Sequence, residues 1–192
     1  MQDAQNTQNT LQFEMVGIGI YKIPGLLTPE ECAQHIAAAE RANFQGATIT
    51  RAGADQLDNR VRNNDRVIDD NPALADALWA RAKLCMPPEM MGRRLLGLNP
   101  RLRYYRYVPG QRFKWHADGA YTNEAGQTSI LTFMIYLNSD YEGGETRFSW
   151  TAVSPQAGMA LVFDHSQSHE GTEVRSGTKY VLRSDVMSEE KT

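Results

Sequence analysis

The sequence predicts a mostly β protein with flanking helices, an α+β fold in which a double-stranded β-helix (jelly roll) core carries N-terminal helices on one sheet. Helix start signals occur in the first half, whereas from Asn99 onward short segments rich in Leu, Tyr, Phe and Val alternate with Gly, Asn and Pro turns. This pattern is typical of double-sheet jelly rolls. The length of 192 residues suits one domain, predicted over residues 13–192, after a polar and flexible tail over residues 1–12.

Two helices are predicted before the strands. The first has Thr28 as its N-cap, Pro29 at its first position and Glu31 completing a capping box, and it runs to about Ala42. The second covers residues 71–85, because an Asn-Pro pair begins it and a Pro-Pro pair follows it.

Alternation along the predicted strands assigns side chains to two faces. Leu102 and Tyr104 should face the helices. The inner face should carry residues from three strands, most of them polar: Arg103, Tyr105 and Tyr107; Thr132, Met134 and Tyr136; and Lys179, Val181, Arg183 and Asp185. A polar inner face, where a core would be apolar, indicates a functional site.

The segment that ends in His116 is also predicted to alternate. If His116 and Asp118 point into the barrel, Lys114 shares their side, and Phe113 and Trp115 point outward beneath the helices.

A metal site is predicted from His116, Asp118 and His169. Two imidazoles and one carboxylate form the facial triad that holds non-heme Fe(II) and leaves positions open for substrates. His165 is a rival to His169, but Gly171 and the ten-residue spacing to Lys179 favour His169. Lys179 supplies a cation at which an acidic cosubstrate could dock.

Four segments carry a family resemblance: YRYVPGQRFKWHADG (105–119), LTFMIYLN (131–138), YEGGETRF (141–148) and HEGTEVRSGTKYVLRSDVM (169–187). Their order resembles the catalytic domain of prolyl 4-hydroxylases, within the Fe(II)/2-oxoglutarate dioxygenase superfamily. The resemblance covers the predicted catalytic core, about residues 98–187. It is weaker at LTPEEC and fades over residues 44–95.

The resemblance implies an oxygenase that uses Fe(II), 2-oxoglutarate and O2, with ascorbate (vitamin C) as a reductant. Lys179 would hold the C5 carboxylate of 2-oxoglutarate, and Arg183 is the alternative. Tyr107, Tyr136 and Thr132 would line the cosubstrate site. The GGET turn is expected to have no chemistry of its own. The loop over residues 119–128 is expected to be a mobile lid over the substrate.

The substrate implied by the resemblance is a carbon of a peptide or an amino acid, with proline favoured. Arg103, Tyr105 and Arg66 are the candidate substrate residues, because an Arg fork can fix a carboxylate. Residues 91–117 carry seven Lys or Arg and no acid before His116. This charge leaves a hydroxylase of an acidic small molecule as an alternative. The net charge of −3 and the lack of a recognisable base-flipping pocket argue against nucleic acid.

Other functional classes remain as rivals. One is a jelly-roll binding protein without catalysis, and another is a cupin-like metalloenzyme that does not use 2-oxoglutarate. Cys32 and Cys85 are expected to be reduced thiols, and a cytoplasmic location is expected for an enzyme of ferrous iron. No apolar run is long enough to span a bilayer, so no membrane association is expected.

Overall fold

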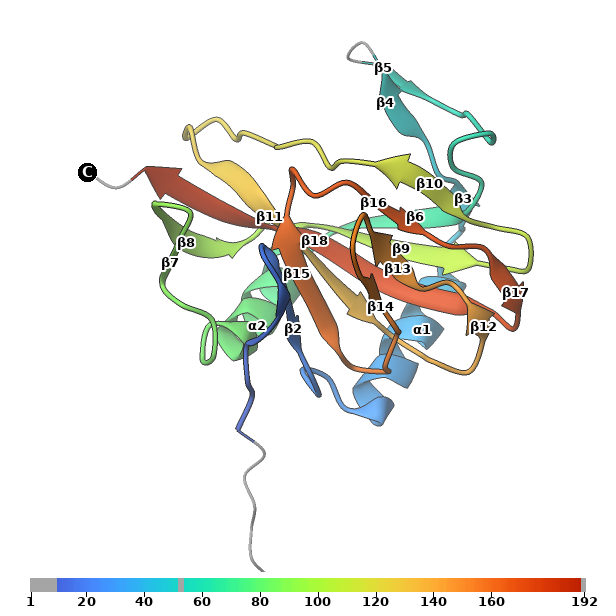
Figure 1. Cartoon of the computed structure of the whole chain (residues 1–192), viewed down its shortest axis with the longest axis horizontal. Coiled ribbons are helices and arrows are strands. Elements are labelled where there is room, and N and C mark those ends of the chain that lie inside the picture. The colour runs from blue at the N-terminus through green and yellow to red at the C-terminus, as the bar shows by residue number, and fades with distance from the viewer. Residues whose placement is uncertain (1–9, 52–53, 191–192) are drawn as a thin grey trace, which may run out of the picture.

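The computed structural model describes residues 10–51 and 54–190, which form two helices and eighteen strands (Figure 1). A ten-stranded sheet, the major sheet, has the order β1-β2-β15-β11-β18-β9-β6-β3, with β8 paired to β18 and β7 to β8. Its strands are β1 Glu14–Gly17, β2 Ile20–Ile23, β3 Gln45–Gly46, β6 Asp65–Asp70, β7 Glu89–Met90, β8 Arg93–Leu98, β9 Arg101–Tyr107, β11 Thr128–Tyr136, β15 Ala160–Asp164 and β18 Lys179–Glu190. The mostly β architecture confirms the predicted fold class.

A four-stranded minor sheet, in the order β10-β16-β13-β14, lies over one face of the major sheet. Its strands are β10 Phe113–His116, β13 Thr146–Phe148, β14 Ala152–Val153 and β16 His169–Gly171. Two two-stranded sheets complete the set: β12 Glu142–Gly143 with β17 Val174–Ser176, and β4 Ile49–Arg51 with β5 Ala54–Gln56. The two sheets therefore enclose the interior that the sequence predicted to be polar.

Both helices pack on the opposite face of the major sheet (Figure 1). Helix α1 spans Pro29–Arg41 and helix α2 spans Pro72–Ala82. The capping box of α1 is confirmed: the Glu31 backbone N–H donates to Thr28 Oγ1 at 3.2 Å, and the Thr28 N–H donates to Glu31 Oε2 at 2.9 Å. None of the helices formed by the described residues is long and apolar enough to cross a membrane.

Helix α2 is shorter than predicted. It ends at Ala82 rather than about Cys85, because the chain tightens there into turns in which the Cys85 N–H donates to the Ala82 carbonyl at 3.1 Å. Cys85 and the buried Cys32 are free thiols.

The prediction for β10 was wrong in part. The pairing of β10 with β16 shifts register between Phe113 and His116, so strict alternation does not hold across the strand. Phe113 therefore lies toward the site, and its ring stacks on His116 with a centroid distance of 3.5 Å. Lys114 is exposed, and Trp115 is exposed to solvent rather than covered by the helices.

The predicted N-terminal tail lies mostly outside the described residues, which begin at Thr10. Within the described part, Leu11 packs against the core between the helices and the major sheet.

Candidate active site

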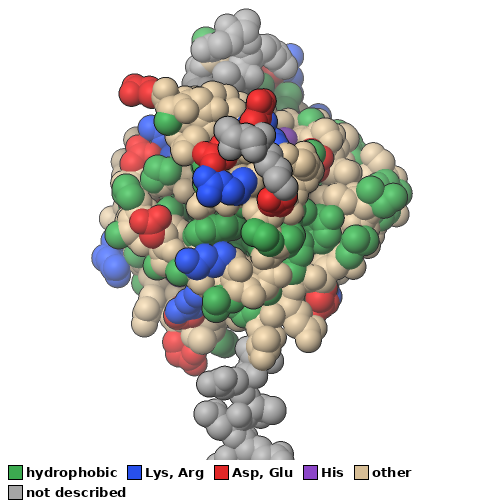
Figure 2. All heavy atoms as spheres, turned by 90° about the vertical axis from the view of Figure 1, so that its left-hand side faces the viewer, with side chains coloured by type: hydrophobic (Ala, Val, Ile, Leu, Met, Phe, Trp, Pro, Cys, Tyr) green, Lys and Arg blue, Asp and Glu red, His purple; other side chains and the backbone are tan. Residues whose placement is uncertain are grey.

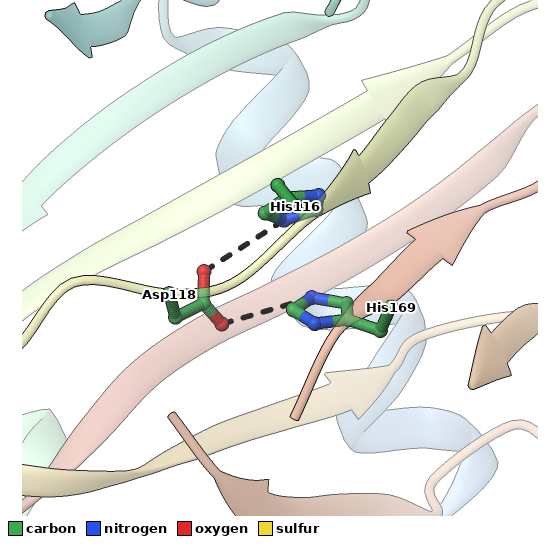
Figure 3. A group of neighbouring side chains, drawn as sticks. All are labelled: His116, Asp118 and His169. Atoms are coloured by element: carbon green, nitrogen blue, oxygen red, sulfur yellow. Dashed lines mark ion pairs between the residues drawn. The ribbon is translucent and has the colours of Figure 1, made fainter. Parts of the chain in front are cut away.

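The three predicted metal-binding residues come together between the paired strands β10 and β16 (Figure 3). His116 ends β10, Asp118 follows two residues later, and His169 begins β16 directly opposite His116. One ligand atom from each residue lies within 4.8 Å of the others. Asp118 stands between the rings, with Oδ1 3.7 Å from His116 Nε2 and Oδ2 3.7 Å from His169 Nε2. A small divalent cation could bind between the ligand atoms of these three residues.

A hydrogen bond from Nδ1 fixes the orientation of each imidazole ring. His116 Nδ1 donates to the Lys114 carbonyl at 2.7 Å, and His169 Nδ1 donates to the Gln167 carbonyl at 2.9 Å. A carbonyl only accepts, so the proton resides on Nδ1 and each Nε2 presents its lone pair to the shared space.

The protonation states also suit a cation. Burial, together with the neighbouring His169, lowers the pKa of His116 to about 3. Burial likewise lowers the pKa of His169, although Asp118 opposes the shift. Burial alone would raise the pKa of Asp118, but Arg183, His169 and the Thr132 hydrogen bond together outweigh it and hold that pKa well below its usual range. At neutral pH the group therefore offers two neutral imidazoles and one carboxylate, which fits Fe(II).

A chain of hydrogen bonds from neighbouring side chains orients the Asp118 carboxylate. Thr132 Oγ1 donates to Asp118 Oδ2 at 2.5 Å and accepts from His165 Nδ1 at 3.1 Å. The Ser129 hydroxyl lies 3.0 Å from His165 Nε2 and completes the chain. The structure therefore brings His169 to the group and ties His165 into the hydrogen bonds that orient Asp118. Thr132 was predicted to contact the cosubstrate. In the structure its hydroxyl binds the Asp118 carboxylate.

Lys179 lies in the same narrow cavity as the three residues. The side chain is buried, and Nζ donates to the Gly144 carbonyl at 2.6 Å. Burial lowers the pKa of Lys179 to about 7, although Glu145 opposes the shift. None of the ion pairs among the described residues includes Lys179, so an incoming carboxylate would supply its missing counter-charge.

The GGET turn, residues 143–146, borders this cavity. The Gly144 carbonyl holds Lys179, and Thr146 lines the cavity and bonds Tyr136 Oη at 2.6 Å. Gly143 has a φ of 77°, and a Cβ there would lie 2.1 Å from the Glu173 carbonyl oxygen, so the turn requires glycine.

The two predicted tyrosines differ in position. Tyr107 lines the narrow cavity, and burial raises its pKa to about 12. Tyr136 is fully buried behind Thr146, outside the lining. Lys179 Nζ lies 5.2 Å from the Tyr107 ring centroid and 5.4 Å from that of Tyr136, so both rings shape the surroundings of the ammonium group.

Arg183, the rival of Lys179, is bound to carboxylates. Its Nη1 lies 3.0 Å from Asp118 Oδ1 and its Nη2 lies 3.0 Å from Asp185 Oδ1. Asp185 also pairs with Arg103 at 3.1 Å. A chain of alternating charges thus connects the candidate metal site to Arg103.

A larger cavity of about 710 Å³ opens beside the narrow one and shares Tyr105, Phe113, His116, Asp118 and Arg183 with it. The predicted substrate residues Arg103, Tyr105 and Arg66 all line this cavity, as do Gly119, Ala120 and Tyr121 from the predicted lid. Arg66 Nη2 donates to Thr48 Oγ1 at 3.0 Å. Arg62 also lines the cavity, and its only signal in the sequence is its place in the cationic run RVRNNDR, residues 60–66.

Most of the basic run over residues 91–117 lies at the surface in ion pairs. Arg93 pairs with Glu190 and Arg94 with Glu189. Figure 2 shows acidic and basic side chains interspersed over one face of the molecule. Other pairs join Arg101 to Asp70, Arg106 to Glu40 and Asp65, and Arg112 to Glu173. Of the basic residues in this run, Arg101 and Arg103 line the larger cavity.

The chain is similar to known proteins in sequence and in fold. The profile of the 2OG-Fe(II) oxygenase superfamily matches residues 102–184. A PKHD-type hydroxylase of Delftia acidovorans is 31% identical over 191 residues, covering 88% of this chain and 80% of that protein. The viral collagen prolyl hydroxylase of Paramecium bursaria Chlorella virus-1 superposes with a TM-score of 0.61 at 22% identity, covering 88% of this chain and 96% of that one.

A further structural neighbour is a Trichoplax adhaerens prolyl hydroxylase in complex with a hypoxia inducible factor peptide fragment. It superposes with a TM-score of 0.69 at 16% identity, covering 88% of this chain and 83% of that one. The fold and the site define an iron- and 2-oxoglutarate-dependent oxygenase. The chain belongs to the 2OG-Fe(II) oxygenase superfamily and is similar to its PKHD-type and prolyl 4-hydroxylase members.

Proposed function

We propose that His116, Asp118 and His169 hold the Fe(II) of this oxygenase and that Lys179 binds the C5 carboxylate of 2-oxoglutarate. The observation that carries the proposal is the convergence of two free Nε2 atoms and one carboxylate within 4.8 Å, in a cavity that also contains a buried lysine. When bound, the iron supplies the oxidative decarboxylation of 2-oxoglutarate coupled to hydroxylation of an unactivated carbon.

The side chains of the chain itself bind, orient and shield. Lys179 offers the only ammonium group in the lining of the narrow cavity among the described residues, which supports it over Arg183 as the C5 anchor. Arg183 is committed to Asp118 and Asp185, so its proposed role is to orient the Asp118 carboxylate. Tyr107 and Phe113 line the cavity and exclude water from the cosubstrate.

The substrate is proposed to be a peptide or an amino acid, with prolyl carbon favoured. Support comes from the names of the related proteins, which are hydroxylases of the PKHD and prolyl types, and from the size of the adjoining cavity. We also propose a cytoplasmic location, where reducing conditions keep Cys32 and Cys85 as thiols and iron ferrous, with ascorbate as the reductant.

The test is succinate formation from 2-oxoglutarate by protein loaded anaerobically with Fe(II) and then exposed to air. Asp118→Ala removes the only carboxylate of the group, so turnover should fall by about 1,000-fold or more and iron content should drop. Asp76→Ala, on the exposed surface of α2, is the matched control and should behave as wild type. Full turnover and iron content in Asp118→Ala would contradict the assignment.

A further inference from the structure

Three guanidinium groups converge on Tyr105, on the wall that the narrow and the larger cavity share. Arg62 Cζ lies 4.3 Å from the Tyr105 ring centroid, and Arg103 and Arg183 line the larger cavity with it. Arg103 and Arg183 are directly opposite each other in the register of β9 and β18. We call Arg62, Tyr105, Arg103 and Arg183 the Tyr105 arginine cluster.

Arg62 is the unusual member of the cluster. Only 4% of the residue is exposed, and its guanidinium lies between the rings of Tyr105 and Phe113, 4.5 Å from the centroid of the latter. Its Nε donates to Asn64 Oδ1 at 2.7 Å, but its Nη2 has no hydrogen-bond partner. No carboxylate among the described residues pairs with Arg62. Burying an unpaired cation is costly, which indicates that a ligand supplies the missing charge.

Arg183 provides a second unpartnered donor in the same cluster. Its Nη1 and Nη2 bind Asp118 and Asp185, whereas its buried Nε has no hydrogen-bond partner. Arg103 shares Asp185 with it. The cluster therefore has three positive charges against two carboxylates, one of which belongs to the candidate iron site. An excess of at least one positive charge remains beside the reacting centre.

The cluster also acts on Tyr105. Burial alone would raise the pKa of this phenol, but Arg62, Arg183 and Arg103 outweigh it and lower the pKa. The hydroxyl of Tyr105 thus lies in a positive potential that would equally favour an anionic group of a ligand.

We propose that the Tyr105 arginine cluster binds a carboxylate of the substrate, with Arg62 as the main anchor, so that the substrate is an amino-acid derivative bearing a free acid. One unbalanced guanidinium suits one singly charged group, and the planar fork of a guanidinium suits the planar oxygens of a carboxylate. Phe113 stacks on both Arg62 and His116, so the anchored acid lies beside the candidate iron ligand. This inference rests on the proposed function and deepens it. It also moves the anchor from Arg103, which the sequence favoured, to Arg62.

The test compares two pools of substrates. One contains the twenty N-acetyl amino acids and the other contains their N-acetyl amides, and each is scored for the increase in succinate formation over enzyme alone and for products with one added oxygen. We expect the acids to stimulate succinate formation at least about tenfold more than the amides, because a site built for a charged partner rejects the analogue that lacks it. Among the amides, only those of aspartate and glutamate should retain activity if a side-chain carboxylate is the group bound.

Substitutions locate the anchor. Arg62→Met keeps an extended side chain between the two rings but removes the charge, and it should lower kcat/KM for the best acid about 100-fold, chiefly through KM. Arg62→Lys keeps the charge but not the fork, so its loss should be smaller. Arg112→Met is the matched control, because Arg112 lies outside both cavities and pairs with the exposed Glu173. Thermal melting verifies that each variant is folded.

The outcomes are distinct. Equal stimulation by acids and amides, no stimulation by either pool, or an unchanged acid preference in folded Arg62→Met would each overturn the carboxylate site. In all three cases, succinate formed without any added substrate would still support the proposed function, because it reports turnover of 2-oxoglutarate. Absence of iron-dependent succinate formation under every condition would instead refute the proposed function.

Discussion

The two faces of the major sheet carry different parts of the protein's chemistry. Strand β9 sends Leu102 and Tyr104 to the helices and Arg103, Tyr105 and Tyr107 to the cavities, and β11 divides its residues in the same way. The helical face is a continuous apolar core, whereas the other face combines a second, smaller apolar cluster with buried charges that only partners can stabilise. Stability should therefore reside mainly in one face and function in the other.

Phe133→Ala tests the helical face and should have the largest effect on stability. Phe133 is 1% exposed and points into the core beneath the helices, so the substitution should lower the free energy of unfolding by about 3–5 kcal/mol. The kcat of the folded fraction should stay within about threefold of wild type, since the iron-site face is not altered. Denaturant titration and succinate formation measure the two quantities. Loss of kcat in protein shown to be folded would mean that the two faces are coupled.

Lys179→Ala tests the opposite face. It should weaken 2-oxoglutarate binding about 100-fold, because the C5 carboxylate would be buried without a cation. Arg183→Ala should weaken that binding less, because Arg183 is occupied by Asp118 and Asp185. Calorimetric titration of 2-oxoglutarate into manganese-loaded protein gives both constants. The reverse order would identify Arg183 as the anchor and leave Lys179 a structural residue.

Thr132→Val tests whether the hydrogen bonds of Thr132 set the position of the Asp118 carboxylate. The valine has nearly the same shape but cannot donate to Asp118 or accept from His165, so metal affinity should fall about 10- to 100-fold. Thr172→Val removes the bond of a half-buried threonine to Glu145 outside this network and is the matched control. Equal metal affinity in wild type and Thr132→Val, measured by competition with a chelator, would show that Asp118 is held by other contacts.

The sequence predicted the apolar half of this comparison better than the polar half. Period-two alternation identified the faces of β9 and β11, because hydrogen-bonded ladders impose it along regular strands. It was wrong for β10, where a register shift turns Phe113 toward the site. The candidate metal and cosubstrate residues could be predicted because they belong to sequence motifs that follow one another in a characteristic order. Arg62 was missed, since its significance depends on two rings and a missing partner, neither of which is visible in a linear pattern.

The smallest expected effect is the pH dependence of 2-oxoglutarate binding. It shows whether Lys179 takes up a proton when the cosubstrate binds or is already charged. Burial lowers the pKa of Lys179 to about 7 in the free protein, and a bound carboxylate favours the charged form and raises that pKa. Below pH 7 the lysine is already protonated, so the 2-oxoglutarate Kd should vary little. Above pH 7 binding must take up a proton, and the Kd should rise by up to about tenfold per pH unit.

Lys179→Arg sharpens this prediction, because a guanidinium stays charged throughout the range and the rise should vanish. Any pH effect on His116, Asp118 or His169 is common to both proteins and cancels when their titrations in manganese-loaded form are compared. A flat profile in wild type would mean that Lys179 is charged without its ligand, so that Glu145 offsets its burial more strongly than the structure indicates. An equal slope in both proteins would assign the proton to another group and separate Lys179 from the pH dependence of cosubstrate binding.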